Sequence, residues 1–218
     1  MADAAGSAGA RRLGSRGDAV TVAVIADMNG AYGATTYSDI VATARDHIVS
    51  RAPSVVLTTG DMISAQRADI RNQVAMWEAF DAHLWSHFAA AGLPFAPSPG
   101  NHDASGYAEW SADRAAYQAY WAPRVPRAPG IRFVADADYP WHYAFSLGQV
   151  LFVSLNSTQV GGLQQAQRTW LNELLATHGP SHQASVVFGH LPLHPVSRIK
   201  GDETLDDNDI QSLPPPWG

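Results

Sequence analysis

The chain has 218 residues, of which 46% are hydrophobic and 16% charged, values typical of one soluble globular domain. Its net charge of -6 argues against a general nucleic-acid binder, because phosphate backbones are bound by clustered positive charge. The only lysine, Lys200, does not lie in a Gly-Lys-Ser/Thr motif, which excludes a Walker A phosphate loop. The absence of cysteine excludes disulfides, thiolate metal sites and cysteine nucleophiles.

The two ends of the chain differ in composition from the middle. Residues 1–18 consist mainly of Ala, Gly, Ser and Arg and predict a disordered leader. Arg11-Arg12 is not followed by the apolar segment of an export signal, and no apolar run is long enough to span a membrane. We therefore expect a soluble cytoplasmic or periplasmic protein with a domain over residues 19–210 and a Pro-rich tail over residues 211–218.

The first part of the domain predicts a βαβ unit. Val20–Ala26 is a near-continuous apolar run, which is typical of a strand covered on both faces. Ser38 can cap a helix that extends through Asp46 or beyond, and Ser54–Thr59 predicts a second buried strand. A strand, a helix and a strand in this order favour a right-handed parallel unit.

The remaining elements follow in chain order. A helical stripe of apolar residues spans Ala68–Ala91, a short strand spans Leu93–Pro97, and an aromatic-rich helix is predicted over residues 107–121. The Pro- and Arg-rich stretch Pro123–Asp138 predicts a loop. A hairpin, an amphipathic helix and a final strand are expected at Tyr143–Leu147 with Val150–Leu155, Gln164–His178 and Ala184–Phe188.

Metal-capable side chains follow several of the predicted strands. In open α/β sheets, ligands collect beyond the carboxyl ends of strands, so residues distant in sequence can share one site. The oxygen and imidazole donors suit zinc, manganese or iron, and we expect two divalent ions. The candidate metal ligands are Asp27, Asn29, Asp61, Asn101 and His190.

Catalytic roles can be assigned to Asp61 and to the two residues that follow Asn101. Asp61 is the natural bridging carboxylate, because its two oxygens can hold two ions about 3.5–4 Å apart. Paired ions can deprotonate a shared water and neutralise the charge of a phosphoryl group. His102 is expected to donate a proton to the leaving oxygen, and Asp103 is expected to fix the tautomer of His102.

The blocks Asp27-x-Asn29, Gly60-Asp61, Gly100-Asn101-His102-Asp103 and Gly189-His190 resemble, in order and spacing, the signature of the calcineurin-like metallophosphoesterases. The resemblance covers about residues 20–200 and implies a four-layer αββα sandwich with a dinuclear centre. It also implies that Asp27 and Asn29 bind the first metal, that Asp61 bridges, and that Asn101 and His190 bind the second. The implied substrate is a small phosphomonoester or phosphodiester, with triesters as a conceivable side activity.

Two departures from this family's pattern stand out. The first block usually reads Asp-x-His, and Asn29 is a weaker, harder donor than imidazole. The family's last block, Gly-His-x-His, does not occur between His190 and Gly218. One hypothesis is therefore an active metal-dependent phosphoesterase, and the alternative is a truncated, weak or inactive remnant that serves binding or assembly. A shortened second sheet predicts an exposed apolar edge and a homo-oligomer.

Several further residues have two readings. His194 is either a substitute ligand or a loop histidine, and Tyr32 is either part of the substrate pocket or a turn aromatic. Asn156 follows a hairpin strand and is a candidate for substrate contact. His83 and His87 share a helix face but have no third donor nearby, which favours a solvated surface. A serine hydrolase is excluded by the absence of a Gly-x-Ser-x-Gly elbow.

Overall fold

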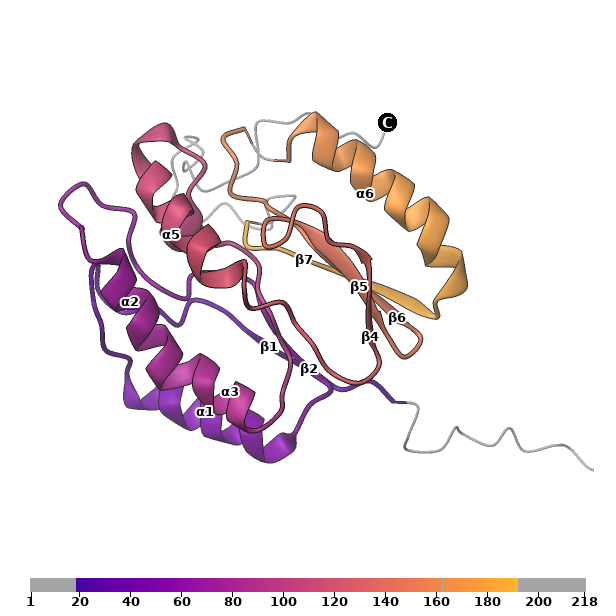
Figure 1. Ribbon diagram of the computed structural model, residues 1–218, viewed down its shortest axis with the longest axis horizontal. Coiled ribbons are helices and arrows are strands. Elements are labelled where there is room, and N and C mark those ends of the chain that lie inside the picture. The colour runs from indigo at the N-terminus through magenta and orange to yellow at the C-terminus, as the bar shows by residue number, and fades with distance from the viewer. Residues whose placement is uncertain (1–18, 162, 192–218) are drawn as a thin grey trace, which may run out of the picture.

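The computed structural model describes residues 19–161 and 163–191, which form two β-sheets with helices on their outer sides (Figure 1). The first sheet has three parallel strands in the order β1-β2-β3, and the second has four strands in the order β4-β5-β6-β7. The leader, the Pro-rich tail and His194 lie outside the described residues. Within those residues, no helix is long and apolar enough to cross a membrane.

The first sheet contains the predicted βαβ unit. Strand β1 (Val22–Ile25) is followed by helix α1 (Asp39–Arg51) and by strand β2 (Val55–Thr58), which pairs with β1 in parallel. Ser38 is the N-cap residue of α1, although its side chain makes no capping hydrogen bond. Strand β3 (Phe95–Ala96) then pairs in parallel with β2.

The helical region between β2 and β3 is shorter and less regular than predicted. It consists of α2 (Gln73–Phe80), a π-helical turn η1 (Asp81–Trp85) and α3 (Ser86–Ala90). Val74 belongs to the apolar stripe that the sequence predicts within Ala68–Ala91 but is 69% exposed, whereas Trp77, Phe80, Leu84 and Phe88 are buried. The buried face therefore starts later than the apolar pattern indicates, at Met76 and Trp77.

A short helix α4 (Asn101–Ala104), a 3-10 turn η2 (Ala108–Trp110) and helix α5 (Ser111–Trp121) follow β3. The second sheet then begins with β4 (Ile131–Ala135), so the prediction of a loop throughout Pro123–Asp138 is wrong for these residues. Antiparallel pairing with β5 supplies the hydrogen bonds of β4 and outweighs the Pro- and Arg-rich composition around it.

The rest of the second sheet agrees with the predicted pattern. Strands β5 (Tyr143–Leu147) and β6 (Val150–Ser154) form an antiparallel hairpin. Helix α6 (Gln165–His178) and the 3-10 turn η3 (Gly179–Ser181) then lead to β7 (Ala184–Phe188), which pairs in parallel with β6. This crossover places α6 on the outer side of the second sheet (Figure 1).

Three hydrophobic clusters separate four layers. Val56 of β2 packs toward α2, whereas its neighbours Val55 and Leu57 pack between the two sheets. Phe152 of β6 also lies between the sheets, and the adjacent Val153 packs in the cluster that contains residues of α6. The alternation along each strand thus distributes side chains to both faces, and the expected αββα architecture is confirmed.

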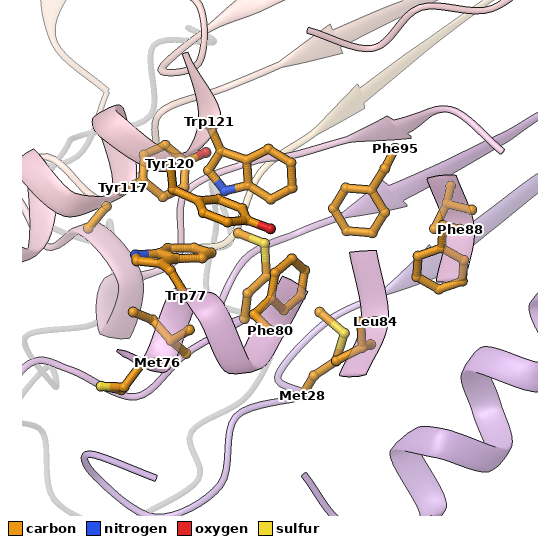
Figure 2. Close-up of a cluster of buried hydrophobic side chains, with 14 of the residues drawn as sticks. Met28, Met76, Trp77, Phe80, Leu84, Phe88, Phe95, Tyr117, Tyr120 and Trp121 are labelled. Carbon is orange, nitrogen blue, oxygen red and sulfur yellow. The ribbon is translucent and has the colours of Figure 1, made fainter. Parts of the chain in front are cut away.

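The outer cluster beside the first sheet is rich in aromatic rings (Figure 2). Trp77 of α2 stacks on Tyr120 of α5 at a centroid distance of 4.6 Å, and Phe95 of β3 stacks on Trp121 at 5.4 Å. These contacts join α2, α5 and β3 into one unit. The unit provides a rigid support for α4, which lies between β3 and α5 in the chain and carries Asn101 and His102.

Strand β1 is not covered on both faces, so that expectation is wrong. Ala23 and Ile25 pack against the outer cluster, but Val22 and Val24 are 39% and 60% exposed. Val22 and Val24 pair with the fully buried Val55 and Leu57, so the exposed side chains lie on the inter-sheet side of an edge strand. The homo-oligomer that was expected from an open apolar edge stays a prediction.

Candidate metal centre

Three ends of strands bring acidic and imidazole side chains to one place. Asp27 follows β1, Asp61 follows β2 and His190 follows β7, and one ligand atom of each lies within 4.8 Å of those of the other two. Asn101 reaches the same place from the first turn of α4, because its Oδ1 lies 2.7 Å from His190 Nε2. The predicted convergence of these distant residues is therefore present in the fold.

The backbone beneath the site is strained and closely packed. Asp27 and Asp61 have φ angles of 51° and 56°, in the left-handed region that non-glycine residues seldom occupy. Gly100 lies so close to Asp61 that a Cβ at this position would overlap the backbone nitrogen and Oδ1 of Asp61. A glycine is thus required before Asn101 if the second and third strand ends are to meet.

The side chain of His190 is held in one orientation. Its Nδ1 lies 2.9 Å from the carbonyl oxygen of Thr59, which can only accept, so Nδ1 donates and the neutral ring presents a lone pair at Nε2. Its backbone nitrogen and that of Leu191 donate to the Ser157 hydroxyl at 3.1 and 2.8 Å. The Nε2 lone pair consequently faces Asn101 Oδ1 and, at 3.5 Å, Asp61 Oδ1.

Both asparagines have their amide nitrogens engaged elsewhere. Asn29 Nδ2 donates to the Ile63 carbonyl oxygen at 3.2 Å, and Asn101 Nδ2 donates to Gln66 Oε1 at 2.9 Å. Each amide therefore keeps its oxygen available as a donor atom for a cation. Both acceptors belong to the residues 61–66, which we call the 61–66 segment.

Burial and neighbouring histidines set the charge of Asp61, which is 3% exposed. Burial raises the pKa of its carboxyl group, and the nearby His190 and His102 partly oppose this rise. The backbone N–H of His102 also donates to Asp61 Oδ1 at 3.0 Å. A buried carboxylate with few donors is a group that a cation stabilises strongly.

His102 lies at the rim of this cluster. Its Nε2 is 3.8 Å from Asp61 Oδ2, and its side chain is 23% exposed. The ring of Tyr32 lies 5.2 Å from the His102 ring, and Tyr32 is 44% exposed. His102 therefore has an open side toward solvent and an aromatic neighbour at the edge of the site.

Asp103 does not have the position that was expected for it. Its Oδ1 accepts a hydrogen bond from the Ile63 N–H at 2.8 Å, and its Oδ2 accepts one from the Gly100 N–H at 3.1 Å. Within the described residues, His102 Nδ1 has no hydrogen-bond partner. The carboxylate thus connects the start of α4 to the 61–66 segment and does not set the tautomer of His102. Complete burial raises the pKa of Asp103 well above its usual range.

Asn156 is also engaged in the framework of the protein. It is 4% exposed, and its backbone N–H and C=O form hydrogen bonds with the side-chain amide of Gln167 on α6. Its Oδ1 accepts from Thr158 Oγ at 3.1 Å. These bonds support the Ser157 loop under His190, and none of them reaches a candidate ligand.

No sequence pattern indicates a role for Gln66, Thr59 or Ser157. Thr59 and Gln66 act on the site through a carbonyl oxygen and a side-chain amide, and neither belongs to a metal-ligand pattern. Only the contacts between segments distant in sequence reveal them. His83 and His87 are both exposed, and an Arg45 guanidinium nitrogen lies 3.3 Å from His87 Nε2.

The donor set fits a divalent cation. The Asp61 carboxylate, the His190 Nε2 lone pair and the Asn101 Oδ1 face one another, and a positive charge between them removes the repulsion of these acceptors. Asp27 adds a carboxylate oxygen within 4.8 Å of the Asp61 and His190 ligand atoms, and the Asn29 amide nitrogen is held by the Ile63 carbonyl oxygen, which leaves the Asn29 oxygen as a further candidate donor. The fold and this donor set define a metal-binding α/β protein with its site at the strand ends.

Comparisons with known proteins identify the family. The model of the calcineurin-like phosphoesterases matches residues 20–212, so the chain belongs to this family. A dimetal phosphatase from Danio rerio is similar in structure, with a TM-score of 0.54 and 16% identity over 81% of this chain and 71% of that one. The comparison with curated proteins found no match.

Proposed function

We propose that this protein is a metal-dependent phosphoesterase that hydrolyses small phosphomonoesters or phosphodiesters. The observation that carries the proposal is the meeting of Asp27, Asp61 and His190 ligand atoms within 4.8 Å, in a chain of the calcineurin-like phosphoesterase family. The similar zebrafish protein is a dimetal phosphatase, which supports a two-ion centre here. Divalent ions in such a centre lower the pKa of water and neutralise charge on a phosphoryl group.

The ligand roles are proposed from the pattern of the family to which the chain belongs. Asp61 would bridge the ions, with Asp27 and Asn29 on one ion and Asn101 and His190 on the other. The first group contains only oxygen atoms, which favours a hard ion such as manganese over zinc. Thr59 keeps the His190 Nε2 lone pair directed at the site.

His102 is proposed as the general acid. Its Nε2 lies 3.8 Å from Asp61 Oδ2, its Nδ1 has no hydrogen-bond partner within the described residues, and its side chain is partly exposed, so a leaving group could approach it from solvent. A histidine can give a proton to a leaving alkoxide or phenoxide near neutral pH, which contributes about 10²–10⁴-fold to a rate. Tyr32 next to it is proposed to contact the organic part of the substrate.

The primary test measures bound metal and hydrolysis of p-nitrophenyl phosphate and bis-p-nitrophenyl phosphate in the same preparation. We expect turnover that requires Mn²⁺ and disappears with a chelator. Metal binding without hydrolysis of either compound would instead support the inactive remnant, which Asn29 in place of a histidine favours. No metal binding would contradict both functions.

The role of His102 is tested separately with His102→Ala. Within the described residues, His102 Nδ1 has no hydrogen-bond partner and Nε2 approaches Asp61 Oδ2 only at 3.8 Å, so we expect the bound metal to stay unchanged while turnover falls by about 10²–10⁴-fold. His47→Ala on the exposed surface of α1 is the matched control. Loss of metal in His102→Ala would mean that this histidine is a ligand.

A further inference from the structure

The 61–66 segment occupies a central position under the candidate site. Ser64 O accepts a hydrogen bond from Gly33 N at 2.8 Å, and Met62 O accepts one from the Tyr37 hydroxyl at 2.7 Å. On its other side, Ala65 N donates to His102 O at 3.0 Å. The segment therefore lies between the loop that follows β1 and helix α4, and it is fixed to both.

Gln66 ends this segment and makes one specific contact with the site. Its Oε1 accepts from Asn101 Nδ2 at 2.9 Å, and this bond is partly shielded from solvent. An asparagine amide can turn by 180° and exchange its oxygen and nitrogen at little steric cost. In the structure, Gln66 Oε1 accepts from Asn101 Nδ2 while Asn101 Oδ1 points at His190 Nε2.

We propose that Gln66 is a positioning residue that holds the amide oxygen of Asn101 toward the metal centre. This inference rests on the proposed metal-dependent function. Without an acceptor at position 66, the Asn101 amide gains more by turning over, because its N–H can then donate to the His190 Nε2 lone pair at the 2.7 Å position. The turned amide donates to the His190 Nε2 lone pair and no longer presents an oxygen to the metal centre. A metal ion can then bind only after the Asn101 amide has turned back.

The arrangement at Asn29 supports the same principle. There the amide nitrogen is held by the backbone carbonyl of Ile63, which belongs to the same segment and which no side-chain substitution removes. At Asn101 the acceptor is a side chain, so the orientation depends on one residue. Gln66 is consequently the point at which affinity for the second ion can be altered without changing a ligand.

The test compares Mn²⁺ binding by calorimetry to the complete wild-type chain, Gln66→Leu and Gln66→Glu. Leucine has a similar size but no acceptor, and we expect it to weaken one of two binding events by about 10–100-fold. Glutamate keeps the acceptor, and we expect its affinity to stay within about threefold of the wild type or to increase. Gln165→Leu on exposed α6 controls for the same chemical change elsewhere and should bind normally.

A second readout separates this role from a purely structural one. In the metal-free protein, the side-chain amide proton resonances of Asn101 should shift in Gln66→Leu and keep their positions in Gln66→Glu, while the thermal midpoint stays close to that of the control. Wild-type affinity in Gln66→Leu, or equal weakening in both Gln66 variants, would overturn the positioning role alone. If Gln66→Leu does not fold, a tenfold or greater loss in Gln66→Glu overturns the role. Failure of the wild type to bind Mn²⁺ would refute the metal centre and this role with it.

Discussion

Replacement of Asp103 by alanine separates a framework role from a catalytic one. In the structure, both carboxylate oxygens accept backbone hydrogen bonds, one from Ile63 and one from Gly100, and the side chain is completely buried. Asp103→Ala therefore leaves two buried N–H groups without an acceptor. Each such group costs about 1–3 kcal/mol, so the free energy of unfolding should fall by about 2–6 kcal/mol.

The lower part of that range is the more reasonable expectation. Burial raises the pKa of Asp103, which means that the ionised carboxylate is itself costly in this position, and its removal offsets part of the loss. A loss of 2 kcal/mol corresponds to a fall in the melting temperature of at least about 4 °C in a domain of this size. Asp103→Asn keeps one oxygen acceptor and the shape, so it should lie between the wild type and Asp103→Ala.

The assay is urea unfolding of the metal-free protein, with Asp136→Ala as the control for loss of an exposed aspartate. The metal-free state is used so that changes in metal affinity do not enter the measured stability. The framework role would be refuted if Asp103→Ala were as stable as the control and lost as much turnover as His102→Ala. Such a result would mean that the Asp103 carboxylate acts on the His102 ring.

Two other predictions concern close packing and pH. Gly100→Ala places a Cβ against Asp61, so we expect the Mn²⁺ affinity to fall at least about tenfold and the free energy of unfolding to fall by about 1–3 kcal/mol. Gly179→Ala is the control, because a Cβ at position 179 meets open space, and it should change neither quantity. An unchanged Mn²⁺ affinity of Gly100→Ala in calorimetry would contradict the close approach of Gly100 and Asp61. Asp113 on α5 is 3% exposed, and burial raises its pKa while Gln73 and Arg71 partly lower it. Because the folded pKa is above the unfolded value, the stability linked to Asp113 is present at low pH and is lost as the pH rises through the folded pKa. Asp113→Asn should therefore become increasingly more stable than the wild type from pH 4 to pH 7 in urea unfolding, and a pH-independent difference would contradict this sign.

The layered architecture followed from local patterns in the sequence. Runs such as Ser54–Thr59 and Ala184–Phe188 indicated strands, and the hairpin at Gly148-Gln149 was marked by two apolar runs with a short turn. The strand β4 was missed because its apolar residues are embedded among Pro and Arg, and only its pairing with β5 makes it a strand. Exposure of β1 was likewise missed, since an apolar run does not indicate whether a strand lies at the centre or at the edge of a sheet.

The sequence by itself determined which donors this protein offers, because ligand chemistry depends on residue type and each candidate stands directly after a strand or at a sharp turn. Only the tertiary structure decided how these donors are oriented. The tautomer of His190 depends on its hydrogen bond to Thr59, and the Asn101 amide nitrogen donates to Gln66. The Asp103 carboxylate accepts from two backbone N–H groups and not from His102. Such hydrogen bonds join residues that are tens of positions apart in the chain, so no local pattern encodes them, and they exist only once the strands and α4 have packed together.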